Sequence, residues 1–259
     1  MTTKSELKKI SLGSFEGFTA DTVYYTAIGY PNNVFALRFD EMRDVISSRH
    51  GIMKSDFLTI CHIPDELGLY MHDQSKSHFY YYGQLLADVL KEYDIEIENT
   101  AFLSTGVQMR NLAFAVERYE ELWVACFTTA GVRHNAVRIG KDAAVGIERN
   151  GEFKGFGTIC HVVVTNASFD HGALVSSVIT VTEAKNVALQ EMDIRSSHNP
   201  DWLATGTGTD QVIVASGFGE KCKYVQGHTV IGKMMADAVI KSTKEAVANC
   251  IRDTAGQPD

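Results

Sequence analysis

Apolar residues in the first part of the chain alternate with polar ones over short stretches, which is typical of β-strands. The pattern predicts strands at residues 23–28 and 34–39, flanking the turn signal of residues 29–33 (GYPNN). Another strand is predicted at residues 57–63. From Ser77 to Tyr93 the apolar spacing becomes helical, with Ser77 as the expected N-cap.

The second part of the chain mixes short apolar runs with longer helical patterns. Residues 117–121 (ERYEE) are charged and separate two apolar runs, which predicts an antiparallel hairpin. The continuous apolar run 158–166 predicts a strand buried on both faces. Further strands are expected at residues 101–104, 112–116, 123–128 and 211–215. One helix is expected to be capped by Ser168 and to end near Met192, and a final helix is expected to begin near Thr229.

This order of elements predicts a fold class between α/β and α+β. We expect a mixed β-sheet with an antiparallel hairpin, covered by long helices, in a single compact layered domain. The domain is assigned to residues 1–253, and residues 254–259 are expected to be a flexible tail. An N-terminal sub-domain at 1–100 stays open, because no linker marks its edge.

Charge and composition exclude several classes of protein. The 259 residues include 24 Lys+Arg and 32 Asp+Glu, a net charge of −8, which argues against binding to nucleic acid. No apolar run is long enough to insert in a membrane, and the polar residues 1–10 do not resemble a signal peptide. Five cysteines without a C-x-x-C pair favour reduced thiols and a cytoplasmic location.

The most unusual segment is residues 204–210 (ATGTGTD). In an extended chain Thr205, Thr207 and Thr209 would share one side, while Gly206 and Gly208 would leave the other side bare. Three hydroxyls and unhindered N–H groups suit an anionic ligand or a developing oxyanion. Asp210 follows as a base or an orienting carboxylate. The structural alternative is a tight turn or bulge with solvated threonines.

A histidine, His228, and a threonine, Thr229, precede the final helix. If Thr229 is its N-cap, His228 lies at the positive end of the helix dipole, which disfavours the imidazolium form. A neutral imidazole can act as a general base. The alternative is a histidine in a surface loop.

Other candidate ligand contacts lie where predicted strands end. Thr129 and Gly131 lie in a run of small residues at the end of a predicted strand, and Asn135 and Arg138 follow. The guanidinium of Arg138 suits a phosphate or carboxylate ligand. Asn166 ends the buried strand, at a position that commonly faces a crevice. Each residue has an equally simple structural interpretation.

In the following helix, Glu183 and Lys185 interrupt the apolar run. They are two residues apart, so at most one of them serves a common pocket, and Glu183 is preferred. No zinc-ligand spacing, phosphate-binding lysine loop or G-x-S-x-G elbow is present, so we expect neither a metal nor another cofactor. His161, inside the apolar strand, is interpreted as a core histidine.

Six segments in order resemble one family. They are 129–132 (TAGV), 135–140 (NAVRIG), 157–159 (GTI), 178–189 (VITVTEAKNVAL), 204–210 (ATGTGTD) and 227–232 (GHTVIG). Together they are similar to the adenosylcobinamide amidohydrolases of corrinoid salvage, closely over the last half of the chain and loosely over the first. One departure is visible: the family tends to have Asn after G-T-I, where this chain has Cys160 and His161.

The resemblance implies an enzyme that hydrolyses the amide joining the aminopropanol arm to the corrin propionate. Its substrate, adenosylcobinamide or its phosphate, brings its own cobalt, and a homo-oligomer stays open. In our hypothesis Asp210 or Glu183 activates water, the 205–209 segment stabilises the oxyanion, and His228 protonates the amine. A threonine nucleophile, with Thr207 among the catalytic candidates, is the competing version. The rival functions are a non-catalytic corrinoid-binding protein and a metal-dependent amidase using His161 and His228.

Overall fold

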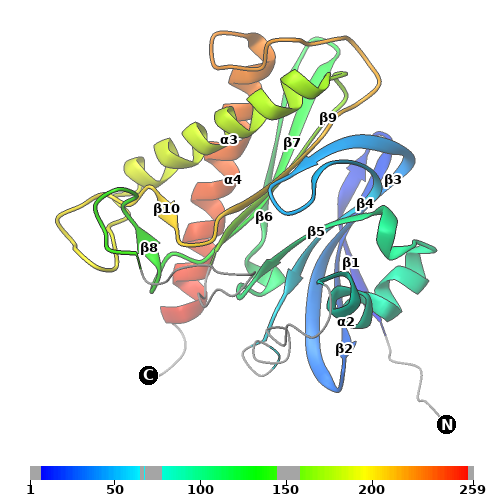
Figure 1. Cartoon of the computed structure of the whole chain (residues 1–259), viewed down its shortest axis with the longest axis horizontal. Helices are drawn as coiled ribbons and strands as arrows, with labels where there is room; N and C mark the ends of the chain where they lie inside the picture. The colour runs from blue at the N-terminus through cyan, green and yellow to red at the C-terminus, as the bar shows by residue number, and fades with distance from the viewer. Residues whose placement is uncertain (1–6, 65–66, 68–77, 145–157, 256–259) are drawn as a thin grey trace.

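The computed structural model describes residues 7–64, 67, 78–144 and 158–255 (Figure 1). The strands in these residues are β1 (Lys8–Phe15), β2 (Phe18–Ala27), β3 (Tyr30–Ser47), β4 (Gly51–His62), β5 (Thr100–Thr105), β6 (Ala113–Tyr119), β7 (Leu122–Ala130), β8 (Ala136–Val137), β9 (Ile159–Thr165), β10 (Gly206–Thr207) and β11 (Gln211–Ala215). The α-helices are α2 (His78–Tyr93), α3 (His171–Glu191) and α4 (Val230–Ala255), and two short 3-10 helices are η1 (Ile97–Asn99) and η2 (Met109–Asn111).

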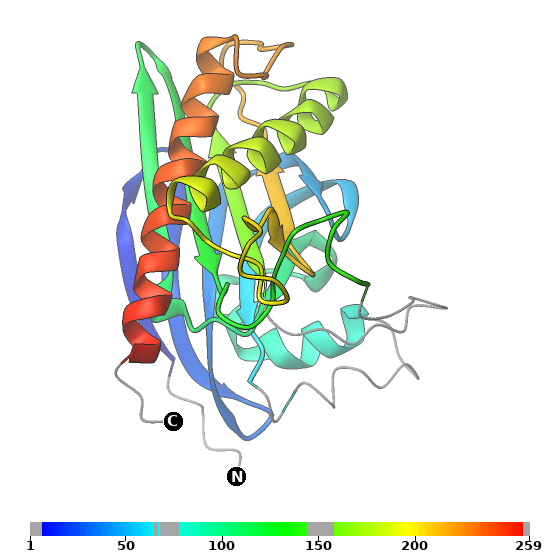
Figure 2. The ribbon, with the colours of Figure 1, turned by 90° about the vertical axis from the view of Figure 1, so that its left-hand side faces the viewer.

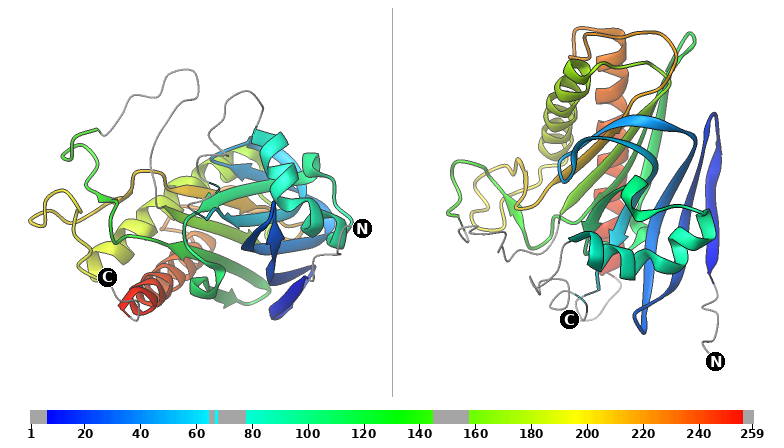
Figure 3. Two further views of the ribbon diagram at one scale, coloured as in Figure 1. Left: turned by 90° about the horizontal axis from the view of Figure 1, so that it is seen from below. Right: turned by 45° about the vertical axis from the view of Figure 1, so that its right-hand side comes forward.

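Nine of these strands form one mixed sheet that curls back on itself. Its path runs β1-β2-β3-β11-β9-β7-β6, and β4 and β5 branch from β3. The pairs β4–β5 and β9–β11 are parallel, while the other pairs are antiparallel. Helices α3 and α4 cover one outer face and α2 covers the other (Figures 1 and 3). The predicted mixed sheet in one layered domain is confirmed, and its class is α+β.

Alternation along the strands separates an inner apolar core from outer clusters beneath the helices. On β9, Cys160, Val162 and Val164 pack into an inner core that also contains Phe35 and Phe127 from the two halves of the sheet. Residues of the opposite parity pack against a helix, as Val163 does beneath α3 and α4. All seven residues of β9 are buried, as the continuous apolar run predicts.

Strand β3 joins the two halves of the sheet. Its first part pairs with β2 and its last three residues pair with β11, while β4 follows its other edge with a register shift between Arg38 and Arg43. The β2–β3 turn is tighter than predicted, because Ile28 and Gly29 both have positive φ and Tyr30 already belongs to β3. The predicted hairpin of β6 and β7 is confirmed.

The helix ends correct two sequence predictions. The cap of α3 is Asp170, whose carboxylate accepts from the N–H of Ala173 at 2.8 Å, not Ser168, which pairs with Lys221. Thr229 caps α4 as predicted, accepting from the N–H of Gly232 at 3.1 Å. Helix α4 continues to Ala255, so it includes the first two residues of the expected tail. Ser77, the expected cap of α2, lies outside the described residues.

Candidate active site

The Gly-Thr segment is a short strand followed by a turn. Gly206 and Thr207 pair with Val137 and Ala136 of β8. The chain then turns so that the N–H of Thr207 lies 3.1 Å from both carboxylate oxygens of Asp210. The three threonines therefore do not line one side of an extended ribbon. The N–H of Thr205 donates to the Val137 carbonyl, so two expected oxyanion donors already have partners inside the protein.

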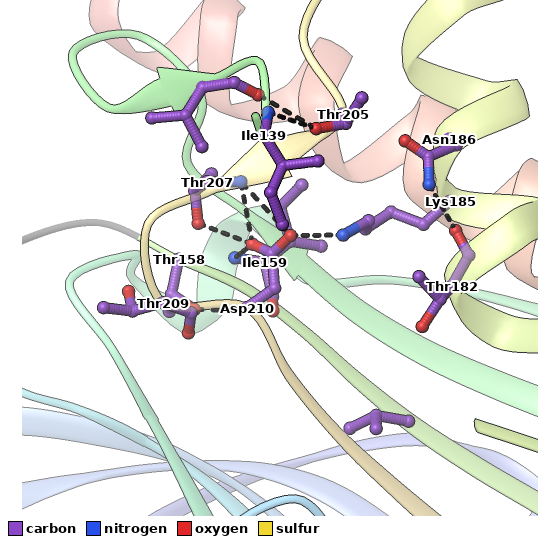
Figure 4. A network of polar contacts seen from close by, with 12 residues as sticks. Ile139, Thr158, Ile159, Thr182, Lys185, Asn186, Thr205, Thr207, Thr209 and Asp210 are labelled. Atoms are coloured by element: carbon purple, nitrogen blue, oxygen red, sulfur yellow. Dashed lines mark hydrogen bonds and ion pairs between the residues drawn. The ribbon is translucent and has the colours of Figure 1, made fainter. Parts of the chain in front are cut away.

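Asp210 is the centre of a polar cluster, shown in Figure 4. Its carboxylate accepts from the hydroxyl and N–H of Thr207, from the N–H of Ile159 at 3.1 Å, and from the Lys185 ammonium. The hydroxyl of Thr158 donates to the carbonyl of Thr209 and closes the lower side of the cluster. These contacts hold the carboxylate in one orientation, since each oxygen has more than one donor.

Lys185 reaches the cluster from α3. Its side chain is 9% exposed and that of Asp210 is 19% exposed. An ammonium buried to this extent is stable only beside a counter-charge. The ion pair therefore connects α3 to the segment that precedes β11, and it places a proton donor next to a carboxylate and a hydroxyl.

Gly206 makes this close approach possible. A Cβ on Gly206 would stand 2.2 Å from Asp210 Oδ2 and 2.6 Å from Lys185 Nζ. The space beside this glycine is filled by the ion pair. Gly208 differs, because a Cβ there would meet nothing within 4 Å.

A second hydrogen-bonded chain runs beneath Lys185. Ser242 directs its hydroxyl to the Val239 carbonyl, so Thr128 donates to Ser242 Oγ at 2.8 Å and accepts from His161 Nδ1 at 3.0 Å. This order assigns the proton of His161 to Nδ1 and leaves Nε2 as a buried lone pair. Burial, and then the charge of Lys185, lower the pKa of His161 to about 3. His161 is a neutral core histidine, as expected.

Several predicted ligand contacts lie near the cluster. Thr129 is fully buried opposite Cys160, and the N–H of Gly131 donates to the Thr158 carbonyl at 3.2 Å. Asn135 immediately precedes β8, and its Nδ2 is buried with no hydrogen-bond partner among the described residues. Arg138 donates to the Leu203 carbonyl at 3.2 Å, so part of its guanidinium is used structurally. Thr205 accepts from the N–H of Ile139 at 3.0 Å.

Four other predicted site residues lie apart from Asp210. Asn166 is at the opposite end of β9, where it accepts from the N–H of Trp123 and donates to the Glu121 carbonyl. His228 is exposed beside the start of α4, and Thr229 is used as the cap; in Figure 1 this helix end and β10 lie at different ends of the molecule. The preference for Glu183 over Lys185 is corrected, because Glu183 is exposed to solvent and Lys185 contacts Asp210.

The sequence contained a signal for Lys185. Position 185 is four residues after Val181 and three before Ala188, and both neighbours are buried. A lysine inside the apolar stripe of a helix is expected to have a buried partner. The N–H donor of Ile159 carried no such signal, because a backbone group is identical at every position.

The described residues contain neither a cluster of metal ligands nor a membrane-spanning helix. No group of three or more His, Cys, Asp or Glu side chains gathers in a way that could hold a metal ion. Within the same residues, no helix combines the length and apolar content needed to cross a bilayer.

Comparisons with known proteins identify relatives of the chain. The family described as adenosylcobinamide amidohydrolase (CbiZ) matches residues 19–255. An uncharacterized protein of Methanocaldococcus jannaschii is 38% identical over 224 residues, covering 82% of this chain and 84% of that protein. An adenosylcobinamide amidohydrolase of Methanosarcina mazei is 36% identical over 110 residues, covering 38% of this chain and 51% of the relative.

Two solved structures are similar at low sequence identity. A protein of Pyrococcus horikoshii matches with a TM-score of 0.44 and 12% identity, over 96% of this chain and 84% of that one. A Burkholderia sp. beta-aminopeptidase matches with a TM-score of 0.39 and 10% identity, over the same shares of the two chains.

Proposed function

Because the chain belongs to the adenosylcobinamide amidohydrolase family and is a hydrolase of amide bonds, we propose that its substrate is adenosylcobinamide or the phosphate of that compound. The bond cleaved joins the aminopropanol arm to the corrin propionate. The products are adenosylcobyric acid and aminopropanol or its phosphate. We further propose that the enzyme acts in the cytoplasm, in corrinoid salvage, and that copies of the chain associate.

One observation carries the assignment of the reaction to the Asp210 cluster. A single carboxylate accepts from the Thr207 hydroxyl and from the Lys185 ammonium. The three groups that amide hydrolysis needs, a nucleophile, a proton acceptor and a proton donor, are therefore joined by hydrogen bonds. The nucleophile is Thr207 in the version that this geometry favours, and a water molecule in the alternative.

In the threonine version the proton balance closes within the cluster. Thr207 Oγ1 attacks the amide carbon, and its proton passes to Asp210. Lys185 donates a proton to the departing amine as the C–N bond breaks, which leaves an ester on Thr207. The proton on Asp210 returns the Lys185 amine to ammonium, and water then hydrolyses the ester to release the carboxylic acid.

The N–H groups of Thr205 and Thr207 already have partners, so we assign stabilisation of the oxyanion to another group. The amide of Asn135 lies one residue before Ala136, which pairs with Thr207, and its Nδ2 has no partner among the described residues. Gly208 follows Thr207 in the turn after β10, and a Cβ on this glycine would meet nothing within 4 Å. We assign the Asn135 amide to the developing oxyanion, with Thr129, Gly131, Thr209 and Arg138 as further substrate contacts.

Mass spectrometry of the products tests the proposed function. Wild-type protein incubated with adenosylcobinamide is expected to yield adenosylcobyric acid, with equal yield when a chelator is present. Thr207→Val and Lys185→Met should each lower turnover by roughly 100-fold or more. The matched control is Thr182→Val, which removes an exposed hydroxyl from α3. Binding of adenosylcobinamide without any product would instead identify a corrinoid-binding protein.

The same assay distinguishes the two nucleophiles. Thr207→Ser keeps a hydroxyl and should retain activity if Thr207 attacks, and intact-protein mass spectrometry should then detect the corrinoid ester on this residue. Full activity in Thr207→Val would exclude the threonine version.

A further inference from the structure

Arg49 has no counter-charge among the described residues, in contrast to three other arginines. Arg38, Arg110 and Arg195 form ion pairs with Asp56, Asp253 and Asp193. Arg49 is half-buried, and no carboxylate among the described residues lies within ion-pair distance of it. A partly desolvated guanidinium without an anion is unfavourable unless a ligand supplies one.

The surroundings hold this guanidinium in place. Arg49 Nη2 donates to Ser104 Oγ at 2.8 Å and to Gln211 Oε1 at 3.3 Å. Its guanidinium carbon lies 5.3 Å from the Tyr82 ring centre and 5.7 Å from that of Phe102. Two hydrogen bonds and two aromatic rings therefore orient the planar group, and they engage only one of its terminal nitrogens.

Three ionisable groups that interact electrostatically with Arg49 are neutral near pH 7. Cys61 and Cys160 are completely buried, and burial raises the pKa of each thiol to about 12. Burial also raises the pKa of Tyr82 above its ordinary value. None of these side chains supplies a negative charge near neutral pH, so the positive charge of Arg49 is not compensated by them.

Arg49 is also close to the proposed reaction centre. Gln211, its acceptor, directly follows Asp210, about 3.3 Å further along the strand. Consecutive side chains leave opposite faces of β11, but both residues lie at its amino end. The thiol of Cys160 donates to the Ser104 carbonyl at 3.4 Å, while the preceding residue, Ile159, donates to Asp210. A ligand across this edge would meet both groups.

We infer that Arg49, oriented by Ser104, Gln211, Tyr82 and Phe102, is an oxyanion-binding subsite beside the Asp210 cluster. Its ligand group is a phosphate or carboxylate, to which a guanidinium donates two parallel hydrogen bonds. This inference rests on the proposed function for the identity of the ligand. Two sources fit the chemistry: a phosphate on the amine arm of the substrate, or the carboxylate of the hydrolysis product.

Kinetics on two substrates and one product separate these sources. Arg49→Gln is expected to raise the KM for adenosylcobinamide phosphate about tenfold, with kcat and the KM for adenosylcobinamide nearly unchanged, if the phosphate is bound. If the carboxylate is bound, the inhibition constant of adenosylcobyric acid should rise about tenfold instead. Arg49→Lys keeps the charge but lacks the planar fork, so it should show an intermediate effect.

The matched control is Arg118→Gln, which removes an exposed arginine of β6 that is likewise without a carboxylate partner among the described residues. The inference is wrong if Arg49→Gln and Arg118→Gln behave alike, or if Arg138→Gln alone gives the shift. Calorimetric titration of inorganic phosphate and adenosylcobyric acid into the same variants measures the subsite without turnover. An inactive wild-type protein that binds either anion through Arg49 would refute the proposed function and leave the subsite intact.

Discussion

Glycines and polar residues lie at both ends of the parallel strands β9 and β11, but different groups fill the space beside the glycine at each end. At the amino end, Asp210 and Lys185 fill the space beside Gly206 with two charged groups. At the carboxyl end, a Cβ on Gly217 would stand 2.2 Å from the Asn166 carbonyl oxygen, so that space is filled by backbone. Figure 2 shows the start of α4 at one end of the molecule and the 195–210 loops towards the other.

This difference shows that glycines and polar residues at strand ends do not by themselves locate a site. Ligands of open parallel sheets usually bind at the carboxyl ends of the strands. Here that end is occupied, because both groups of the Asn166 amide bind backbone partners and Gly219 donates to the Asn166 carbonyl at 2.8 Å. The amino end instead holds two charged side chains, Asp210 and Lys185, that form an ion pair with each other.

Substitution of the central polar residue at each end should give the largest contrast. Asp210→Asn removes the proton acceptor and leaves the Lys185 ammonium without a counter-charge, so we expect kcat to fall by roughly 100-fold or more. Asn166→Ala should lower the free energy of unfolding by about 1–2 kcal/mol and leave kcat unchanged. Steady-state kinetics and urea unfolding of both variants measure the contrast. Equal loss of kcat would contradict the division between the two ends.

Adding one methyl group at each end tests what fills the space beside the glycine. Gly206→Ala pushes against the flexible ends of Asp210 and Lys185, so the fold should persist while kcat falls by roughly 10–100-fold. Gly217→Ala pushes against backbone, and we expect a loss of about 3 kcal/mol or more in unfolding free energy. Thermal melting and steady-state kinetics measure both effects. A Gly206→Ala variant that is fully active and less stable than Gly217→Ala would contradict this prediction.

His161 gives a pH test of the amino end. The pKa of His161 is about 3 in the folded protein, whereas the ordinary value for an exposed imidazole is 6.5. Protonation of His161 therefore favours the unfolded state. Stability from the neutral imidazole is present above pH 6.5 and is lost as the pH falls towards 3, by about 1.4 kcal/mol per pH unit. Urea unfolding between pH 7 and pH 4 should therefore show a steeper decline for wild type than for His161→Gln. Parallel declines would mean that the imidazole is not held neutral.

The smallest effects are expected for two residues that the sequence alone favoured. Glu183 and His228 are exposed and lie outside the Asp210 cluster. Glu183→Gln and His228→Asn should each change kcat by less than about threefold, as surface substitutions away from a reacting centre do. A loss of roughly 100-fold in either variant, measured under the same conditions as Asp210→Asn, would return that residue to the mechanism.

The sequence by itself determined most strands of the large sheet, the three α-helices and the members of the most unusual segment, whereas β1, β8 and β10 were not predicted. A continuous apolar run identified β9, and helical spacing identified α3, because both patterns depend on local geometry. The segment 204–210 was recognised through its glycines, since these residues are costly where they have no role. The cap of α4 at Thr229 followed from the local chemistry of a helix start.

Only the tertiary structure decided which polar residues meet. Lys185 and Asp210 are 25 residues apart, and their contact depends on how α3 crosses the sheet. The extended threonine ribbon was wrong because the Asp210 carboxylate bends the chain through hydrogen bonds that no alternation pattern reveals. Arg49 reaches Gln211 across 162 residues, through the curl of β3. Such long-range pairings follow from burial and packing of the whole chain, whereas sequence periodicity records only which face each residue takes.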